Sequence, residues 1–134
     1  MYEWLKDYQK LCNEIDYLEF SLDRNETELK RWSEGDLFNV RLNENSIASG
    51  LEETIERINK EIKIKEEQRD KLIHLVNTFK GLDHKILKMK YVDGLTLESI
   101  AEELKYSAGY IYKKHAEIMR MLKFVDNFHF TNTK

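Results

Sequence analysis

Two runs of apolar residues, in which steps of four and three alternate, constrain the fold of this chain most. The first run lies within residues 2–32 and the second within residues 51–79. Residues at this spacing share one stripe along a helix, so each run predicts a long helix with a heptad seam. The chain contains no proline, and therefore nothing in these stretches interrupts the helical hydrogen bonds.

The segment between the two runs has the composition of a loop. Residues 33–48 include one glycine, one aspartate and three asparagines, all of which favour turns. The sequence Ser49-Gly50-Leu51-Glu52 has the pattern of a capping box and predicts the start of the second helix. The two helices can fold back as an antiparallel hairpin, or each can pair with another copy of the chain.

The seams are also candidates for self-association. Two cations, Lys65 and Arg69, occupy seam positions of the second run. We expect them to pair with acids such as Glu14, Asp16 or Glu19, or to extend to solvent. The self-association candidates are Trp4, Tyr8, Leu11, Ile15, Leu18, Leu22, Leu51, Ile55, Ile58 and Ile62.

After residue 81 the heptad pattern gives way to shorter helices. The spacing predicts helices at 83–92, 97–104 and 108–123, followed by an aromatic tail, Phe124–Phe130, that serves packing or binds a partner. The chain is therefore expected to be all-α, with two domains. Residues 1–81 form a long helical hairpin or coiled coil for self-association, and residues 82–134 form a three-helix domain with a short aromatic tail.

Residues 96–122 have the pattern of a helix-turn-helix. Thr96 and Ser107 suit the N-cap positions of two consecutive helices, with three residues, 105–107, as the turn between them. Apolar residues at helical spacing supply one buried face on each helix. Small or polar residues at the exposed start of the second helix are what docking in a DNA major groove requires.

The basic charge of the chain is local. The net charge is −3, yet residues 105–123 contain five basic residues and one acid, Glu117. Contact with DNA phosphates needs positive charge in one place rather than over the whole chain, so this segment fits a DNA-binding role.

The same segment resembles region 4 of bacterial sigma factors and the regulators built on that domain. The shared pattern is a basic, Tyr-containing helix (Lys85 to Tyr91), a glycine turn (Gly94), a Thr-Leu-Glu-x-Ile-Ala helix (Thr96 to Leu104), a turn that ends in Ser107, and Ile111 in the recognition helix. The pattern spans roughly a third of the chain. The resemblance implies a helix-turn-helix that binds double-stranded DNA and regulates transcription.

The resemblance also assigns the residues that would contact DNA bases. These are Ala108, Gly109, Tyr110, Tyr112 and Lys113. Sigma factors carry mostly Arg, Glu and Gln at these positions, so we expect this chain to read something other than the ordinary −35 promoter element. The candidates for phosphate contact are Thr96, Ser107, Lys85, Lys88, Lys90, Lys105, Lys114, Arg120 and Lys123.

The layout of the whole chain, a coiled coil followed by this domain, resembles small phage and prophage regulators of Gram-positive bacteria, of the RinA and ArpU kind. That resemblance implies a homodimer or higher oligomer that acts on DNA in the bacterial cytosol, with RNA polymerase as a further candidate partner. The single cysteine, Cys12, also fits a reducing compartment. No signal peptide and no membrane span is expected.

Two other classes of function stay open at this stage. A phage DNA-packaging protein, such as a small terminase subunit, also combines a helix-turn-helix with a coil, and it assembles into rings. A protein that binds polymerase or a sigma factor by mimicking region 4 would use the fold without touching DNA. The sequence has no nucleophile motif, phosphate loop or ligand spacing, so we expect no enzyme activity, metal or cofactor.

Overall fold

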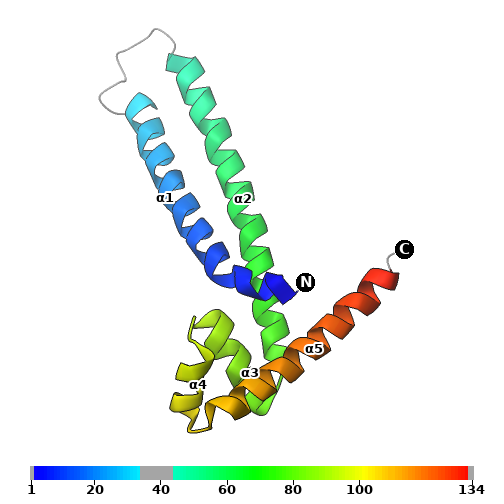
Figure 1. The fold of residues 1–134 in the computed structure, drawn as a ribbon. Coiled ribbons are helices and arrows are strands. Elements are labelled where there is room, and N and C mark those ends of the chain that lie inside the picture. Colours follow the sequence, from blue (N-terminus) through cyan, green and yellow to red (C-terminus); the bar gives the residue numbers. More distant parts are fainter. Residues whose placement is uncertain (1, 34–43, 133–134) are drawn as a thin grey trace. The chain divides into compact units, whose positions relative to one another are not determined.

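The computed structural model describes residues 2–33 and 44–132, and every regular element within these ranges is helical (Figure 1). The elements in chain order are the 3-10 helix η1 (Tyr2–Lys6), α1 (Asp7–Ser33), α2 (Glu44–Thr78), α3 (Gly81–Leu87), the π-helix η2 (Lys88–Val92), α4 (Leu97–Leu104) and α5 (Ala108–Asn132). The predicted all-α fold is confirmed. No helix in the described ranges has the length and apolar character needed to cross a membrane.

The chain divides into two units at a different place from the predicted boundary after residue 81. Leu11–Gln68 form one unit, here called the hairpin unit. Met1–Lys10 and Arg69–Lys134 form the other, here called the terminal unit because it holds both chain ends. The first residues belong with the C-terminal helices because η1 contacts α5 and Leu5 is 1% exposed. A heptad pattern alone does not reveal that contact.

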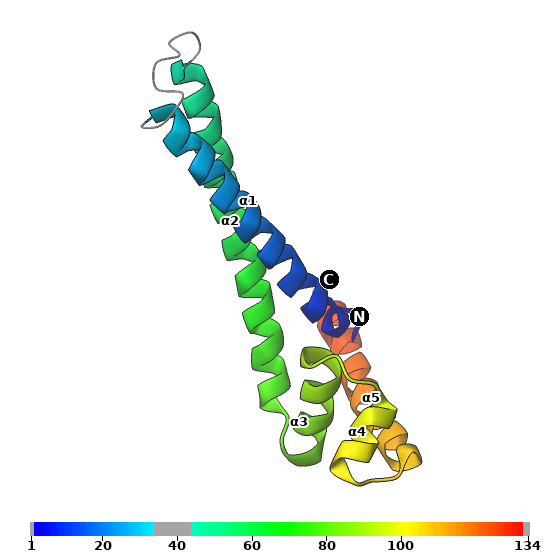
Figure 2. The same cartoon turned by 90° about the vertical axis from the view of Figure 1, so that its left-hand side faces the viewer.

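The hairpin unit consists of the antiparallel segments of α1 and α2. Both views draw these segments side by side (Figures 1 and 2). Leu11 and Ile15 are buried. The other seam residues of this unit are half-buried, namely Leu18, Leu22, Leu51, Ile55, Ile58 and Ile62. A two-helix layer therefore shields its apolar stripe only in part.

An ion pair crosses the hairpin at the predicted place. Lys65 Nζ lies 3.4 Å from Glu14 Oε1, and 3.5 Å from Glu61 Oε1 on its own helix. Glu14 is one of the three acids expected to pair with the seam cations. The second cation behaves differently, because Arg69 Nε lies 3.6 Å from Asp70 Oδ1, its neighbour in sequence.

The expected start of the second helix is wrong. Since α2 begins at Glu44, the sequence Ser49-Gly50-Leu51-Glu52 lies inside the helix and caps nothing. Residues 44–48 contain no helix breaker, so the helix extends through them, and Thr54 Oγ1 donates to the Gly50 carbonyl one turn back at 3.0 Å. The rest of the expected loop, residues 34–43, lies outside the described residues.

The helices α3, α4 and α5 of the terminal unit gather together (Figure 2), and this unit buries apolar side chains. Burying each large apolar side chain stabilises the fold by roughly 1.5–3 kcal/mol. The buried residues of this unit are Leu5, Leu72, Val76, Ile86, Leu87, Tyr91, Ile100, Ala101, Ile111, Ile118, Met119 and Leu122.

The last helix is longer than the sequence predicted. α5 continues to Asn132 instead of ending at residue 123, because no glycine or proline interrupts residues 124–132. The start of the expected aromatic tail is thus part of a helix. Phe124 is 69% exposed and Val125 is 53% exposed, so neither contributes to the core of this unit.

The expected helix over residues 83–92 is divided. α3 passes directly into the π-helix η2, which ends where the Asp93 amide donates to the Lys88 carbonyl at 2.9 Å. Gly94 follows with a φ of +78°, and the Leu95 amide donates to the Met89 carbonyl at 2.9 Å. The side chain of Gln9 donates to the Val92 carbonyl and thereby ties the start of α1 to this turn.

Two glycine substitutions should change stability in opposite directions. Gly94 holds a left-handed conformation that costs a residue with a Cβ about 1–2 kcal/mol, so Gly94→Ala should destabilise the protein by about that amount. Gly50 lies within α2, where an added Cβ meets no atom within 4 Å. Gly50→Ala should therefore stabilise it by up to about 1 kcal/mol. Thermal unfolding followed by circular dichroism measures both, and equal signs would contradict this account.

Candidate nucleic-acid interface

Residues 96–122, over which the sequence predicted a helix-turn-helix, contain α4, a short turn and the first part of α5. α4 and α5 pack through Ile100 and Ile111, which are fully buried, and through Ala101, which is 3% exposed. An alanine at this point lets the two helices approach closely, because it fills little space between them. The contact fixes which face of α5 lies toward the core.

Both helices begin at the predicted caps. Thr96 Oγ1 accepts from the Ser99 amide at 3.1 Å, and Ser107 Oγ accepts from the Tyr110 amide at 3.2 Å. Each bond satisfies an amide that has no partner inside its helix, which is worth about 1 kcal/mol. As both hydroxyl oxygens serve as caps, Thr96 and Ser107 act first as structural residues of the turn.

The turn between the helices is closed by two backbone bonds. The Tyr106 amide donates to the Ala101 carbonyl at 2.9 Å, and the Lys105 amide donates to the Glu102 carbonyl at 3.3 Å. This is a Schellman motif, which needs a left-handed residue directly after the helix. Lys105 takes that conformation, with φ 65° and ψ 39°.

The face of α5 opposite the core consists of small and basic residues. Because successive helical residues are about 100° apart, the residues opposite Ile111 are Gly109, Lys113, Ala116 and Arg120. All four are exposed. An added Cβ at Gly109 would meet no atom within 4 Å, so the packing of the protein does not require glycine there.

Three exposed tyrosines flank this central line. Tyr112 is 46% exposed on one side, and Tyr110 is 41% exposed on the other. The ring of Tyr106, in the turn, stacks on that of Tyr110 with their centroids 5.1 Å apart and an angle of 29° between the planes. The start of α5 thus presents a strip of small residues between aromatic edges.

The residues predicted to contact bases, Ala108, Gly109, Tyr110, Tyr112 and Lys113, are all exposed in the first two turns of α5. Sequence reasoning missed Tyr106 and Ala116 on the same surface. The signals were available, since Tyr106 lies four residues before Tyr110 and Ala116 lies seven after Gly109.

The residues predicted to contact phosphates fall into two groups. Lys85, Lys88, Lys105, Arg120 and Lys123 are exposed, although Lys88 Nζ lies 3.5 Å from Asp93 Oδ2. Two others are half-buried and already have partners. The ammonium group of Lys90 lies 5.7 Å from the centre of the Tyr91 ring, and Lys114 Nζ lies 3.7 Å from Asp83 Oδ1 and 3.9 Å from Glu117 Oε2.

A polar contact also lies beneath α5. Tyr91 Oη is 2.8 Å from His115 Nε2, and the two rings stack with centroids 5.9 Å apart. Burial lowers the pKa of His115 below its ordinary value, and the positive charges of Lys90 and Lys6 lower it further. The imidazole is therefore neutral near pH 7 and holds Tyr91 in the core without adding charge.

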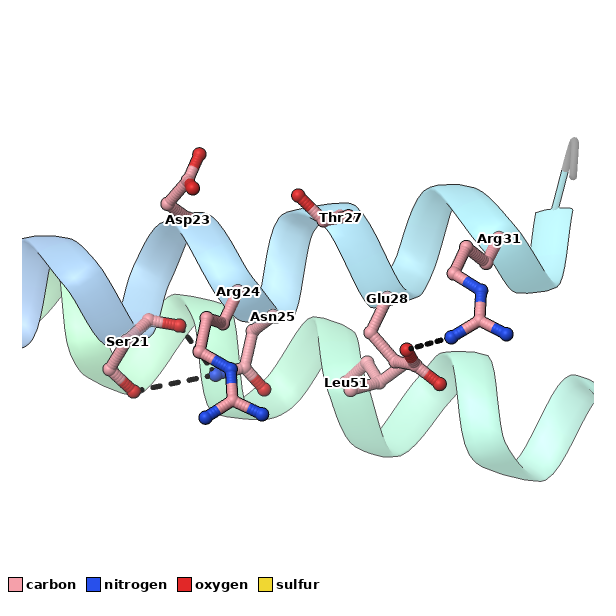
Figure 3. A pocket seen from close by; sticks show the side chains of 8 residues that line it. All are labelled: Ser21, Asp23, Arg24, Asn25, Thr27, Glu28, Arg31 and Leu51. Atoms are coloured by element: carbon pink, nitrogen blue, oxygen red, sulfur yellow. Dashed lines mark hydrogen bonds and ion pairs between the residues drawn. The ribbon is translucent and has the colours of Figure 1, made fainter.

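The hairpin unit contains a hollow that is not part of the exposed face of α5. It has a volume of about 540 Å³ and lies along α1 beside the first part of α2 (Figure 3). Its polar side chains mostly bond one another, since Asn25 donates to the Ser21 carbonyl at 2.7 Å and Arg31 pairs with Glu28 at 3.2 Å. Within the described ranges, no three His, Cys, Asp or Glu side chains are grouped to hold a metal ion.

Acid should weaken the fold through His115. Below about pH 6.5 a histidine in the unfolded chain binds a proton, whereas His115 in the folded chain stays neutral to lower pH. Stability should therefore be highest above pH 6.5 and decline from pH 7 to pH 5. Urea unfolding across this range should show a flatter decline for His115→Gln. The same substitution at exposed His74 is the control, and a wild-type slope in His115→Gln would contradict the assignment.

Comparison with known proteins found no matching protein-family model, no matching curated protein and no matching solved structure.

Proposed function

We propose that this chain is a sequence-specific DNA-binding regulator of transcription that inserts the start of α5 into the major groove. The observation that carries the proposal is the composition of the exposed face of α5. Its first turn has no acidic side chain, its centre line is Gly109, Lys113, Ala116 and Arg120, and its opposite face is buried in the core. A groove about 12 Å wide admits one helix that presents such a face.

The charge of this segment supports the same function. Lys105, Lys113, Arg120 and Lys123 are exposed, while Glu117 lies 3.9 Å from Lys114. The positive end of the α5 dipole adds to the attraction for phosphate, because no carboxylate neutralises it in the first turn. Phosphate contacts from the exposed cations would set affinity, and affinity would fall steeply with added salt.

A regulator of this kind commonly binds two half-sites as a dimer. The seam residues that the sequence predicted for self-association are already buried or half-buried within one chain, so we propose a dimer contact on the outer face of α1 in their place. Tyr17 and Phe20 are 72% and 61% exposed there. Asp16 lies four residues before Phe20 and Arg24 four after it. A second, antiparallel α1 that crosses at Phe20 would set each Asp16 against the other copy's Arg24, as a self-complementary interface requires.

In the cell, the bound regulator would recruit or block RNA polymerase at a phage or mobile-element promoter in the bacterial cytosol. The resemblance to sigma region 4 supports this role, and part of its pattern, Thr96 to Leu104 with Ser107 and Ile111, lies in the described helix-turn-helix.

The DNA-reading surface can be tested by selecting bound duplexes from random DNA and measuring affinity for the best one. Tyr112→Ala with Lys113→Ala should lower that affinity at least about 30-fold, because two base contacts are lost and each good contact contributes about 1–3 kcal/mol. The far-UV circular dichroism spectrum should not change, since both side chains are exposed. Arg120→Ala should instead weaken all duplexes alike and reduce the slope of log affinity against log salt by about 0.9.

The matched control is Lys60→Ala, which removes one exposed positive charge from the hairpin unit. Its affinity should equal that of the wild type. Unchanged binding in the Tyr112/Lys113 variant would refute the assignment of the recognition face. Capture of polymerase without any DNA binding would favour mimicry, and an eight- or nine-membered ring in solution would favour DNA packaging.

The dimer contact can be tested by sedimentation equilibrium. The wild type should be a dimer, and Arg24→Asp should shift it toward monomer because the introduced carboxylate would face Asp16 of the second copy. Adding Asp16→Arg to the same chain should restore the dimer by exchanging the two charges. The control is Phe124→Ser, which removes an exposed apolar side chain from α5. Loss of the dimer in that control, with no effect of Arg24→Asp, would move the interface to α5.

A further inference from the structure

The surface that would face the base edges contains few of the side chains that form paired hydrogen bonds to them. Lys113 is the one exposed cation in the first two turns of α5, and Gly109 and Ala116 offer no polar side-chain atom. In the first two turns of α5 there is no Arg, Asn, Gln, Asp or Glu. The paired hydrogen bonds by which proteins usually recognise guanine, adenine or cytosine therefore have few donors and acceptors here.

Exposed aromatic carbon takes the place of those groups. Tyr106, Tyr110 and Tyr112 are between 41% and 47% exposed, a large apolar area for the start of one helix. The 5.1 Å stack of Tyr106 on Tyr110 holds two rings together as one rigid edge, so neither ring loses much freedom when a ligand covers it. Stacked rings of this kind provide an apolar wall beside the strip of small residues.

Glycine at position 109 adds an independent indication. Glycine in a helix costs up to about 1 kcal/mol relative to alanine, and an added Cβ here would meet no atom within 4 Å. The protein's own packing therefore gives no reason for its choice. Because glycine has no side chain, the backbone of α5 and the flanking rings can come closer to a ligand that covers that face.

One group in the major groove matches an apolar, closely approaching surface. That group is the C5-methyl of thymine, which is the apolar feature that a base pair presents there. We infer that the start of α5 reads thymine methyl groups through Tyr110, Tyr112 and the stacked Tyr106, and that Lys113 adds contact with a guanine. The preferred half-site is accordingly a thymine-rich duplex with a guanine in it. This inference rests on the proposed DNA-binding function.

The test replaces thymine by deoxyuridine, one position at a time, in the duplex selected by the wild-type protein. The exchange removes the methyl group and leaves every hydrogen-bonding atom in place. Affinity measured by fluorescence anisotropy should fall roughly three- to tenfold at each contacted thymine. Deoxyuridine outside the protected half-sites should have no effect, which controls for changes in duplex flexibility.

Two variants assign the effect to the aromatic edge. Tyr110→Phe keeps the ring and should keep the preference for thymine over uracil. Tyr110→Ala removes the ring, and the preference at one position should disappear while the protein stays folded, because Tyr110 is 41% exposed. Parallel loss of affinity for both bases, with the ratio unchanged, would overturn the assignment to Tyr110.

The two hypotheses fail in different ways. If the protein binds no selected duplex, the proposed function itself is wrong. If it binds a selected duplex with high affinity and every deoxyuridine exchange leaves that affinity unchanged, DNA binding stands and methyl readout is wrong. A selected site without thymine in the half-site would likewise overturn the inference.

Discussion

The packing of α4 against α5 is the contact on which the rest of the terminal unit depends. Ile100 of α4 and Ile111 of α5 are both fully buried, and the small side chain of Ala101 is 3% exposed. Once that face of α5 is committed to the core, geometry leaves Gly109 and Lys113 on the opposite side. The candidate interface is therefore a consequence of core packing.

The contacts of His115 and Lys114 explain how a chain of net charge −3 carries a basic surface over an apolar core. His115 stays neutral where it contacts Tyr91, so the core carries no uncompensated charge from it. Lys114, which projects from the same helix, pairs with Asp83 of α3 and stabilises the packing of α5. The exposed cations Lys113 and Arg120 lie on the outer face of α5, where charge costs little and attracts phosphate.

Local signals in the sequence predicted much of this structure. Heptad spacing predicted the long helices, and Thr96 and Ser107 were identified as caps from residue type and position alone. The ends of helices were predicted less well, because a helix continues through any residues that do not break it. The residues from Ser49 match the capping-box pattern but do not start a helix, since α2 begins earlier, at Glu44. α5 likewise differs from the prediction, because it continues beyond residue 123.

The candidate site was also predictable only in part from the sequence. Its exposed residues follow from helical periodicity, so Tyr112 and Lys113 could be placed on one surface from the sequence. The pairing of Tyr91 with His115 joins residues 24 positions apart, and that of Lys114 with Asp83 joins different helices. Neither has a local sequence pattern, because tertiary packing alone brings the partners together.

Lys105 has a consequence for how the stability of this protein should be judged. It holds a left-handed conformation that disfavours any side chain by about 1 kcal/mol or more, at a position where helices commonly end in glycine. Selection for folding alone would favour glycine there. The lysine instead places a positive charge in the turn before α5. The protein is thus less stable than its own backbone permits, and an engineer could recover that stability at this one residue, with loss of its charge.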